Sequence, residues 1–106
     1  IPPQKLSLGV PLYYWGWSVD PPKKLRSGGT YERLKWLKQT YPYYEGFNEL
    51  YKVSYLVYLS QNRKYIVWHE DDRSLGEKIN FAKENNLRGI SAWVLGLENP
   101  KIWEVI

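Results

Sequence analysis

Two short apolar segments, one near each end of the chain, most constrain what it can fold into. Lys5 to Leu12 and Ile90 to Leu95 are rich in residues that favour strands, and such runs are typical of strands buried on both faces. A helix is predicted just before the second segment. Because parallel strands need a crossover connection, usually helical, we expect the two segments to pair in parallel, with a small α+β insert between them.

Helix signals occur at two places between these segments. Thr30 is a suitable N-cap for a helix from Tyr31 to Gln39, in which apolar residues recur at intervals of three and four. Ser74 and Glu77 match the capping box, in which the serine oxygen accepts a bond from a free backbone N–H and the glutamate reaches back to the serine. This motif predicts a second helix that ends near Asn85.

The remaining elements follow from turn and strand signals. Tyr51 to Leu59 and Lys64 to His69 are dense in Tyr, Val and Trp and predict a β-hairpin with a four-residue turn between them. Residues 13–17 and 20–29 are interpreted as loops, because the second of these ranges contains paired prolines and glycines. Asn99-Pro100 is expected to begin a short terminal helix.

The aromatic composition is unusual for a chain of 106 residues. It contains six Trp and ten Tyr but only two Phe. Trp and Tyr combine a flat apolar face with a polar tip, which suits surfaces that bind hydroxyl-rich ligands such as sugars. Ordinary core packing explains the same composition equally well, so the composition leaves both interpretations open.

Several classes of function are disfavoured. The chain has no cysteine, which excludes disulfide scaffolds and thiolate metal sites but leaves the redox compartment open. The net charge of +4 is spread along the chain, whereas nucleic-acid binders concentrate basic residues on one stripe. No apolar run approaches the roughly 20 residues that span a membrane. The chain begins without Met or a signal peptide, so we expect a processed or excised piece.

Three motifs together resemble glycoside hydrolase family 18. Leu8 to Tyr13 (LGVPLY) resembles the seventh barrel strand of that family, which ends in Gly-apolar-Pro-apolar-Tyr. Val67 to Leu75, with Lys78 one helical turn later, resembles the segment that leads into the seventh helix. Leu87 to Gly96 resembles the eighth strand with its Trp. The motifs keep the family's order and spacing over nearly the whole chain.

The resemblance implies an α/β fold, the C-terminal part of a (β/α)8 barrel with its active site at the carboxyl ends of the strands. Residues 1–16 would form the seventh strand and its loop, 17–69 an α+β insertion subdomain that walls the sugar cleft, and 70–106 the seventh helix, eighth strand and terminal helix. The Glu70-Asp71 pair before Arg73-Ser74, and Trp103, are similar to the spore-cortex and cell-wall branch. That branch implies an extracellular, cell-wall or spore-associated location.

Three aromatic residues are the candidate substrate-binding side chains. The family resemblance makes Trp93 the floor under the sugar at the cleavage subsite, whereas the residues alone also allow a Trp buried in the core. Tyr13 lies where barrel enzymes place functional groups, although it could instead pack on a neighbouring loop. Trp17 matches a Trp of the cell-wall branch and either lines the cleft or anchors the insert. Two residues depart from the family pattern: Tyr14 stands where Gly is common, and Gly16 replaces an acidic residue.

The catalytic motif of the family, Asp-x-x-Asp-x-Asp-x-Glu, is absent, so we expect no catalytic residue in this chain. In the family that Glu protonates the leaving oxygen while the substrate's acetamido group attacks the anomeric carbon. The acidic residues Glu70 to Asp72 are interpreted instead as a solvated helix N-terminus. His69 is the sole histidine, and no metal or cofactor is expected.

The sequence therefore predicts part of a hydrolase acting on β-1,4-linked N-acetylglucosamine polymers, either peptidoglycan or chitin. The alternative is a stand-alone carbohydrate-binding or interaction module derived from such a barrel. Expected partners are the polysaccharide and the rest of the barrel, with no nucleic acid and no membrane. Because the end strands look apolar on both faces, self-association of the chain is also expected.

Overall fold

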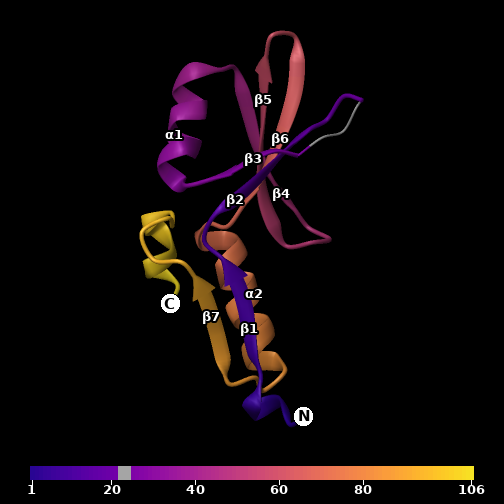
Figure 1. Ribbon diagram of the computed structural model, residues 1–106. Coiled ribbons are helices and arrows are strands. Elements are labelled where there is room, and N and C mark those ends of the chain that lie inside the picture. Colours follow the sequence, from indigo (N-terminus) through magenta and orange to yellow (C-terminus); the bar gives the residue numbers. More distant parts are fainter. Residues whose placement is uncertain (22–24) are drawn as a thin grey trace.

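The computed structural model describes residues 1–21 and 25–106 and shows two lobes stacked end to end (Figure 1). We call residues 1–12 and 70–106 the parallel lobe, and residues 13–69 the sheet lobe. The extents of 49 × 27 × 21 Å make the molecule elongated. Its radius of gyration is 15.1 Å, whereas a compact chain of this length has about 13 Å. Each lobe accordingly contains a hydrophobic core of its own.

The elements, in chain order, are η1 (Pro3–Lys5), β1 (Ser7–Pro11), β2 (Tyr14–Ser18), β3 (Leu25–Gly29), α1 (Tyr31–Thr40), β4 (Tyr43–Asn48), β5 (Val53–Ser60), β6 (Arg63–His69), α2 (Asp72–Glu84), β7 (Gly89–Trp93) and η2 (Pro100–Glu104).

The parallel lobe is built on two strands and a covering helix. β1 pairs with β7 in parallel, from Ser7 opposite Gly89 to Pro11 opposite Trp93, which confirms the predicted pairing. α2 covers one face of this pair, where Val10 and Leu12 pack against Leu75.

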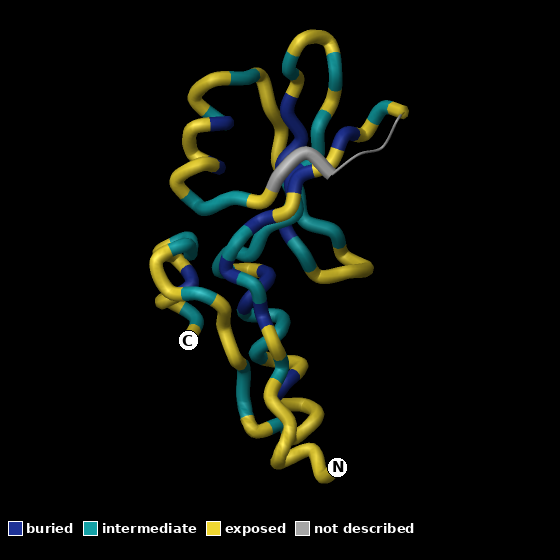
Figure 2. Tube along the Cα trace, viewed as in Figure 1, coloured by how far each residue is buried: buried dark blue, intermediate teal, exposed yellow. Residues whose placement is uncertain are grey.

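The other face of the pair differs from the expectation of a second apolar surface. Residues alternate along a strand, so the residues on this face are the small or polar Ser7, Gly9, Gly89 and Ser91, followed at the carboxyl ends by Pro11 and Trp93. Ser7 and Ser91 form a hydroxyl–hydroxyl hydrogen bond of 2.7 Å there. The prediction that both faces are apolar was therefore wrong. Figure 2 shows exposed residues over much of the N-terminal end of this lobe.

The crossover helix begins three residues earlier than predicted. Asp71, not Ser74, is the N-cap: its Oδ1 atom accepts a hydrogen bond of 3.0 Å from the Ser74 N–H, and the Ser74 Oγ atom accepts one of 2.9 Å from the Asp71 N–H. Both Asp71 and Ser74 are suitable cap residues, but the earlier cap lengthens the helix by a turn and buries Ser74 completely.

The sheet lobe is a five-stranded sheet in the order β3-β2-β6-β5-β4, antiparallel throughout. α1 packs on one face, where Leu34 and Leu37 join Leu56, Tyr58 and Val67 in the core. Helix and hairpin therefore share one core, as expected.

Two expectations for this lobe were wrong. The hairpin turn contains two residues, Gln61 and Asn62, both with positive φ, rather than four. Three strands were missed: β2 and β3 lie within segments interpreted as loops, and β4 carried no prediction.

The lobes are joined closely. Only Leu12 and Tyr13 separate β1 from β2, and only Glu70 and Asp71 separate β6 from α2. The Tyr31 N–H at the start of α1 also donates a hydrogen bond of 3.0 Å to the Leu97 carbonyl oxygen after β7. Among the described residues, no helix has the length and apolarity needed to cross a membrane.

Candidate functional site

The carboxyl ends of β1 and β7 point together toward the sheet lobe (Figure 1). Trp93 is the last residue of β7 and pairs with Pro11 at the end of β1. Its side chain is 69% exposed, and the Trp93–Val94 peptide bond is cis. This exposure excludes a place for Trp93 in the core of the described chain. Its role toward a ligand stays a prediction.

Tyr13 follows the end of β1 and leads into the sheet lobe. Its ring meets the Trp15 ring edge to face, with centroids 5.5 Å apart and an angle of 88°. It also lines a small hollow together with His69 and Leu97. Tyr13 therefore packs on a neighbouring aromatic residue while it lies between the strand ends and the five-stranded sheet.

The residues that depart from the family pattern both face the core. Tyr14 and Gly16 alternate with exposed neighbours along β2 and are buried on the side covered by α1. A Cβ atom at Gly29 would lie 2.4 Å from the Tyr14 ring, so that ring covers Gly29. Tyr14 thus points away from the exposed aromatic residues of β2.

The opposite side of the five-stranded sheet carries a group of partly exposed aromatic residues that we call the aromatic face. Cross-strand pairing places Trp15 opposite Trp68, and Trp68 opposite Tyr55. The next row across the same strands runs from Trp17 through Ile66 and Val57 to Tyr44, so that an aromatic residue stands at each end. The aromatic face comprises Trp15, Trp17, Tyr44, Tyr55 and Trp68.

Of these five, the sequence analysis identified only Trp17. The structure places Trp17 in the open, on the face away from α1, where it does not anchor the core of the sheet lobe. The signal for Trp15 was its spacing of two residues from Trp17, which places both side chains on the same face of a strand. Trp68 and Tyr55 join the group through strand register alone.

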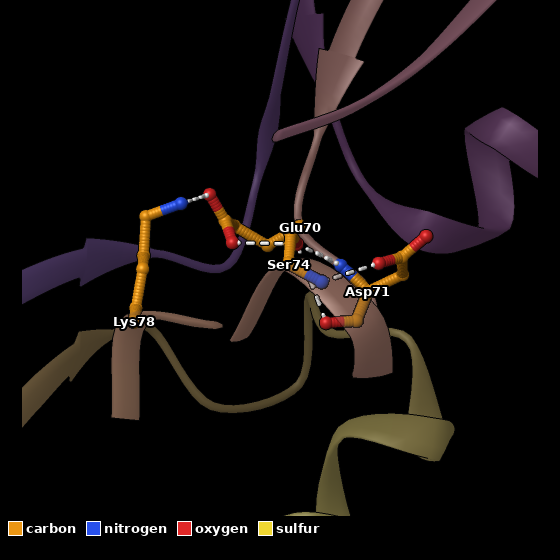
Figure 3. Close-up of polar contacts among 4 residues, drawn as sticks. All are labelled: Glu70, Asp71, Ser74 and Lys78. Atoms are coloured by element: carbon orange, nitrogen blue, oxygen red, sulfur yellow. Dashed lines mark hydrogen bonds and ion pairs between the residues drawn. The ribbon is translucent and has the colours of Figure 1, made fainter. Parts of the chain in front are cut away.

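A buried polar network holds the second connection between the lobes (Figure 3). The Glu70 side chain is only 6% exposed. Its Oε1 atom accepts from the Lys78 ammonium at 2.5 Å, and its Oε2 atom accepts from the Ser74 hydroxyl at 2.7 Å. The interpretation of this acidic cluster as solvated was therefore wrong for Glu70. With both oxygens engaged, Glu70 fixes the start of α2 against β6.

His69 lies at the junction of the lobes. Both of its ring nitrogens are buried and lack a hydrogen-bond partner among the described residues. Burial lowers the pKa of the imidazole from its usual 6.5, against the opposing effect of the Asp71 and Glu45 carboxylates. The ring borders a polar cavity of about 140 Å³, whose lining includes Lys38, Glu45 and Asp71. Neutral His69 is thus the favoured form at neutral pH.

Among the described residues, no group of three or more His, Cys, Asp or Glu side chains is placed to hold a metal ion. Ser54 lies opposite His69 in the β5–β6 pairing, yet no hydrogen bond joins their side chains. The arrangement instead offers exposed aromatic surface beside the ends of two parallel strands.

Comparison with known proteins identifies the family. Residues 1–98 match the family Glycosyl hydrolases family 18. The cortical fragment-lytic enzyme of Bacillus subtilis (strain 168) is 33% identical over 110 residues, which cover 97% of this chain and 25% of that enzyme. The chain therefore spans about a quarter of the length of this relative.

Solved structures show the same fold. The spore cortex-lytic enzyme SleL of Bacillus megaterium QM B1551 superposes with a TM-score of 0.82 at 29% identity, covering 98% of this chain and 25% of SleL. A family 18 chitinase from Cycas revoluta, solved in complex with (GlcNAc)4, shares the fold at a TM-score of 0.71 and 21% identity, covering 88% of this chain and 29% of the chitinase. With its mixed α/β fold and the match over residues 1–98, this chain belongs to glycosyl hydrolase family 18.

Proposed function

We propose that this chain is the C-terminal part of a (β/α)8 barrel hydrolase that cleaves β-1,4 linkages in N-acetylglucosamine polymers. β1 and β7 would be the seventh and eighth barrel strands, and residues 17–69, together with the part of β2 that precedes them, the insertion between them. The names of the relatives favour peptidoglycan of the spore cortex as the substrate and a spore-associated location.

The observation that carries the proposal is the exposed Trp93 at the carboxyl end of β7. Active sites of (β/α)8 barrels lie at this end of the strands. On the side of the strand pair away from α2, the Trp93 ring offers a broad apolar surface on which the C–H groups of a sugar ring can pack. Tyr13, at the end of the adjacent strand, would border the same sugar, and Trp17 would line the cleft further out.

The reaction would use the substrate's own acetamido oxygen as nucleophile. That oxygen attacks the anomeric carbon while a glutamic acid protonates the departing glycosidic oxygen, and water later opens the cyclic intermediate with retention. The residues of this chain would hold the sugar and exclude water. The glutamic acid would come from the fourth barrel strand, so the isolated chain is expected to be inactive on chitin oligomers.

The alternative function, a stand-alone carbohydrate-binding module, is favoured by one observation. Each lobe contains its own hydrophobic core, and such cores favour folding of the chain without further domains. The sequence encoded upstream of this chain distinguishes the two functions. An Asp-x-Asp-x-Glu motif within about 200 residues upstream supports the hydrolase, because (β/α)8 barrels have about 250 residues.

The test is Trp93→Ala in the full-length protein that contains this chain. We expect a reduction of about fivefold or more in kcat/KM on N-acetylglucosamine oligomers, because aromatic stacking contributes of the order of 1 kcal/mol or more. Trp103→Ala is the matched control, since Trp103 is also more than half exposed but lies on η2. Unchanged kinetics for Trp93→Ala, with circular dichroism like that of the unmodified protein, would remove Trp93 from the site.

A further inference from the structure

We propose that the aromatic face is a second glycan-binding surface, on which a β-linked sugar chain lies across the strands of the sheet lobe. This inference rests on the proposed function for its ligand class, but, Trp17 apart, it assigns binding to residues that the proposed function leaves out of the cleft. Its centre is the row formed by Trp15, Trp68 and Tyr55.

A glycine lies beside the row at each end. Gly46, on the outer strand β4, pairs with Tyr55 on β5. A Cβ atom at Gly46 would lie 2.3 Å from the Tyr55 hydroxyl oxygen. At the other end Gly28 pairs with Trp15, and a Cβ atom there would lie 3.4 Å from the Trp15 ring. The Tyr55 ring therefore reaches over Gly46, and Trp15 packs beside Gly28 while its side chain is 44% exposed. The Tyr55 and Trp68 rings meet edge to face, with centroids 5.6 Å apart and an angle of 63°.

The chemistry of this face suits a neutral sugar ring better than a charged partner. The residues that β5 and β6 place on it are Val53, Tyr55, Val57, Leu59, Lys64, Ile66 and Trp68. Lys64 thus carries the only charge that these two strands contribute. Beside the row, an apolar hollow of about 230 Å³ is lined by Tyr44, Val57 and Lys64, among others. Flat rings pack on sugar C–H faces, while the Trp N–H and Tyr O–H tips can meet hydroxyl groups.

The length and the position of the row indicate that it binds an oligosaccharide or polysaccharide rather than a single sugar. The distance across three strands is about 10 Å, which exceeds one sugar ring. At one end the Trp15 ring touches Tyr13, which leads directly to the strand ends where Trp93 lies. A polymer held near Trp93 would therefore pass Tyr13 before it reaches the row. This continuity is the reason to assign a glycan, and not a second protein, to the aromatic face.

The experiment measures binding of the full-length protein to insoluble peptidoglycan and to chitin by depletion from solution. Trp15→Ala and Tyr55→Ala are each expected to raise the Kd for the polymer about tenfold, with a smaller effect on a disaccharide. Trp36→Ala is the matched control, because Trp36 is 40% exposed, close to the 44% of Trp15, but lies on α1 on the other side of the sheet. Its affinity is expected to equal that of the unmodified protein.

The outcomes separate this inference from the proposed function. If the unmodified protein cleaves the polymers and both variants bind them normally, the aromatic face is no glycan site and the proposed function stands. If Trp15→Ala lowers thermal stability or solubility with polymer affinity intact, the face packs on protein, and the inference is again overturned. No affinity of the unmodified protein for either polymer would overturn both. Trp15→Phe, which keeps a ring, should retain most of the affinity and shows that any loss is not a failure to fold.

Discussion

The two lobes use their strands in opposite ways. The sheet lobe joins five strands, and α1 closes one of its faces, so its core is complete within the described residues. The parallel lobe has two strands, each with an unpaired outer edge among the described residues, and its face away from α2 carries Ser7, Gly9 and Ser91. The same short chain therefore holds one lobe whose sheet has five paired strands and one lobe whose two strands each leave an edge unpaired among the described residues.

The largest expected effect of this difference is on assembly. The open edges of β1 and β7 are available for pairing, so the isolated chain is expected to self-associate through the parallel lobe. Light scattering across a concentration series should give a mass well above 12.6 kDa. Ser91→Lys, which places a charge on the open face, should reduce the mass, whereas Gln61→Lys in the hairpin turn should not. A single 12.6 kDa species at high concentration, with cooperative unfolding, would show that both lobes are self-sufficient.

The next effect tests whether the two cores are independent. Leu56 and Leu75 are both completely buried, one in each core. Replacing either with Ala should lower the free energy of unfolding by about 2–5 kcal/mol. Hydrogen exchange should then show α1 and the hairpin losing protection together in Leu56→Ala, with β1 and β7 affected only in Leu75→Ala. Equal loss of protection in both lobes from either variant would mean that the chain unfolds as one unit.

The smallest effect concerns the junction, where His69 is buried and neutral. Its pKa is lowered in the folded chain, so the unfolded chain binds more protons below pH 6.5. Stability should be constant above that pH and should fall as the pH drops below 6.5, by less than about 1.4 kcal/mol per pH unit, until the folded pKa is reached. The charged residues that line its cavity are Lys35, Lys38, Glu45, Asp71, Asp72 and Lys101.

Denaturant unfolding at pH 7.5 and pH 5.5 measures this dependence. His69→Gln removes the imidazole, and the difference between the two pH values should shrink in this variant. A variant with the same pH dependence as the unmodified chain would assign the loss at low pH to the surrounding carboxylates instead.

The sequence predicted the elements that contain continuous runs of strand-forming residues or apolar residues at helical spacing. The parallel pairing of β1 and β7, α1 and the hairpin all follow from such patterns. β2 was mistaken for a loop because its buried positions hold Gly16 and Ser18, which hide the alternation. β4 is an outer strand with largely exposed residues, so no apolar pattern marks it. β2 in addition depends on long-range pairing with β6, which a local pattern does not contain.

The candidate site divides in the same way. Trp93 and Tyr13 were found because a motif fixes their position at the strand ends. Trp68 and Tyr55 could not be grouped with Trp15, since only the register between β2, β6 and β5 brings them together. The start of α2 was ambiguous for another reason: two overlapping cap motifs share Ser74, and the hydrogen bonds of Asp71 decide between them.

The two short connections between the lobes have a consequence for ligand binding. Each holds only two residues, one pair before β2 and one pair before α2, and the second is fixed by the buried Glu70. The backbone torsions at the junction are therefore already fixed in the folded chain. A sugar chain that spans the strand ends and the sheet would meet surfaces already in position, so little conformational entropy would be lost on binding.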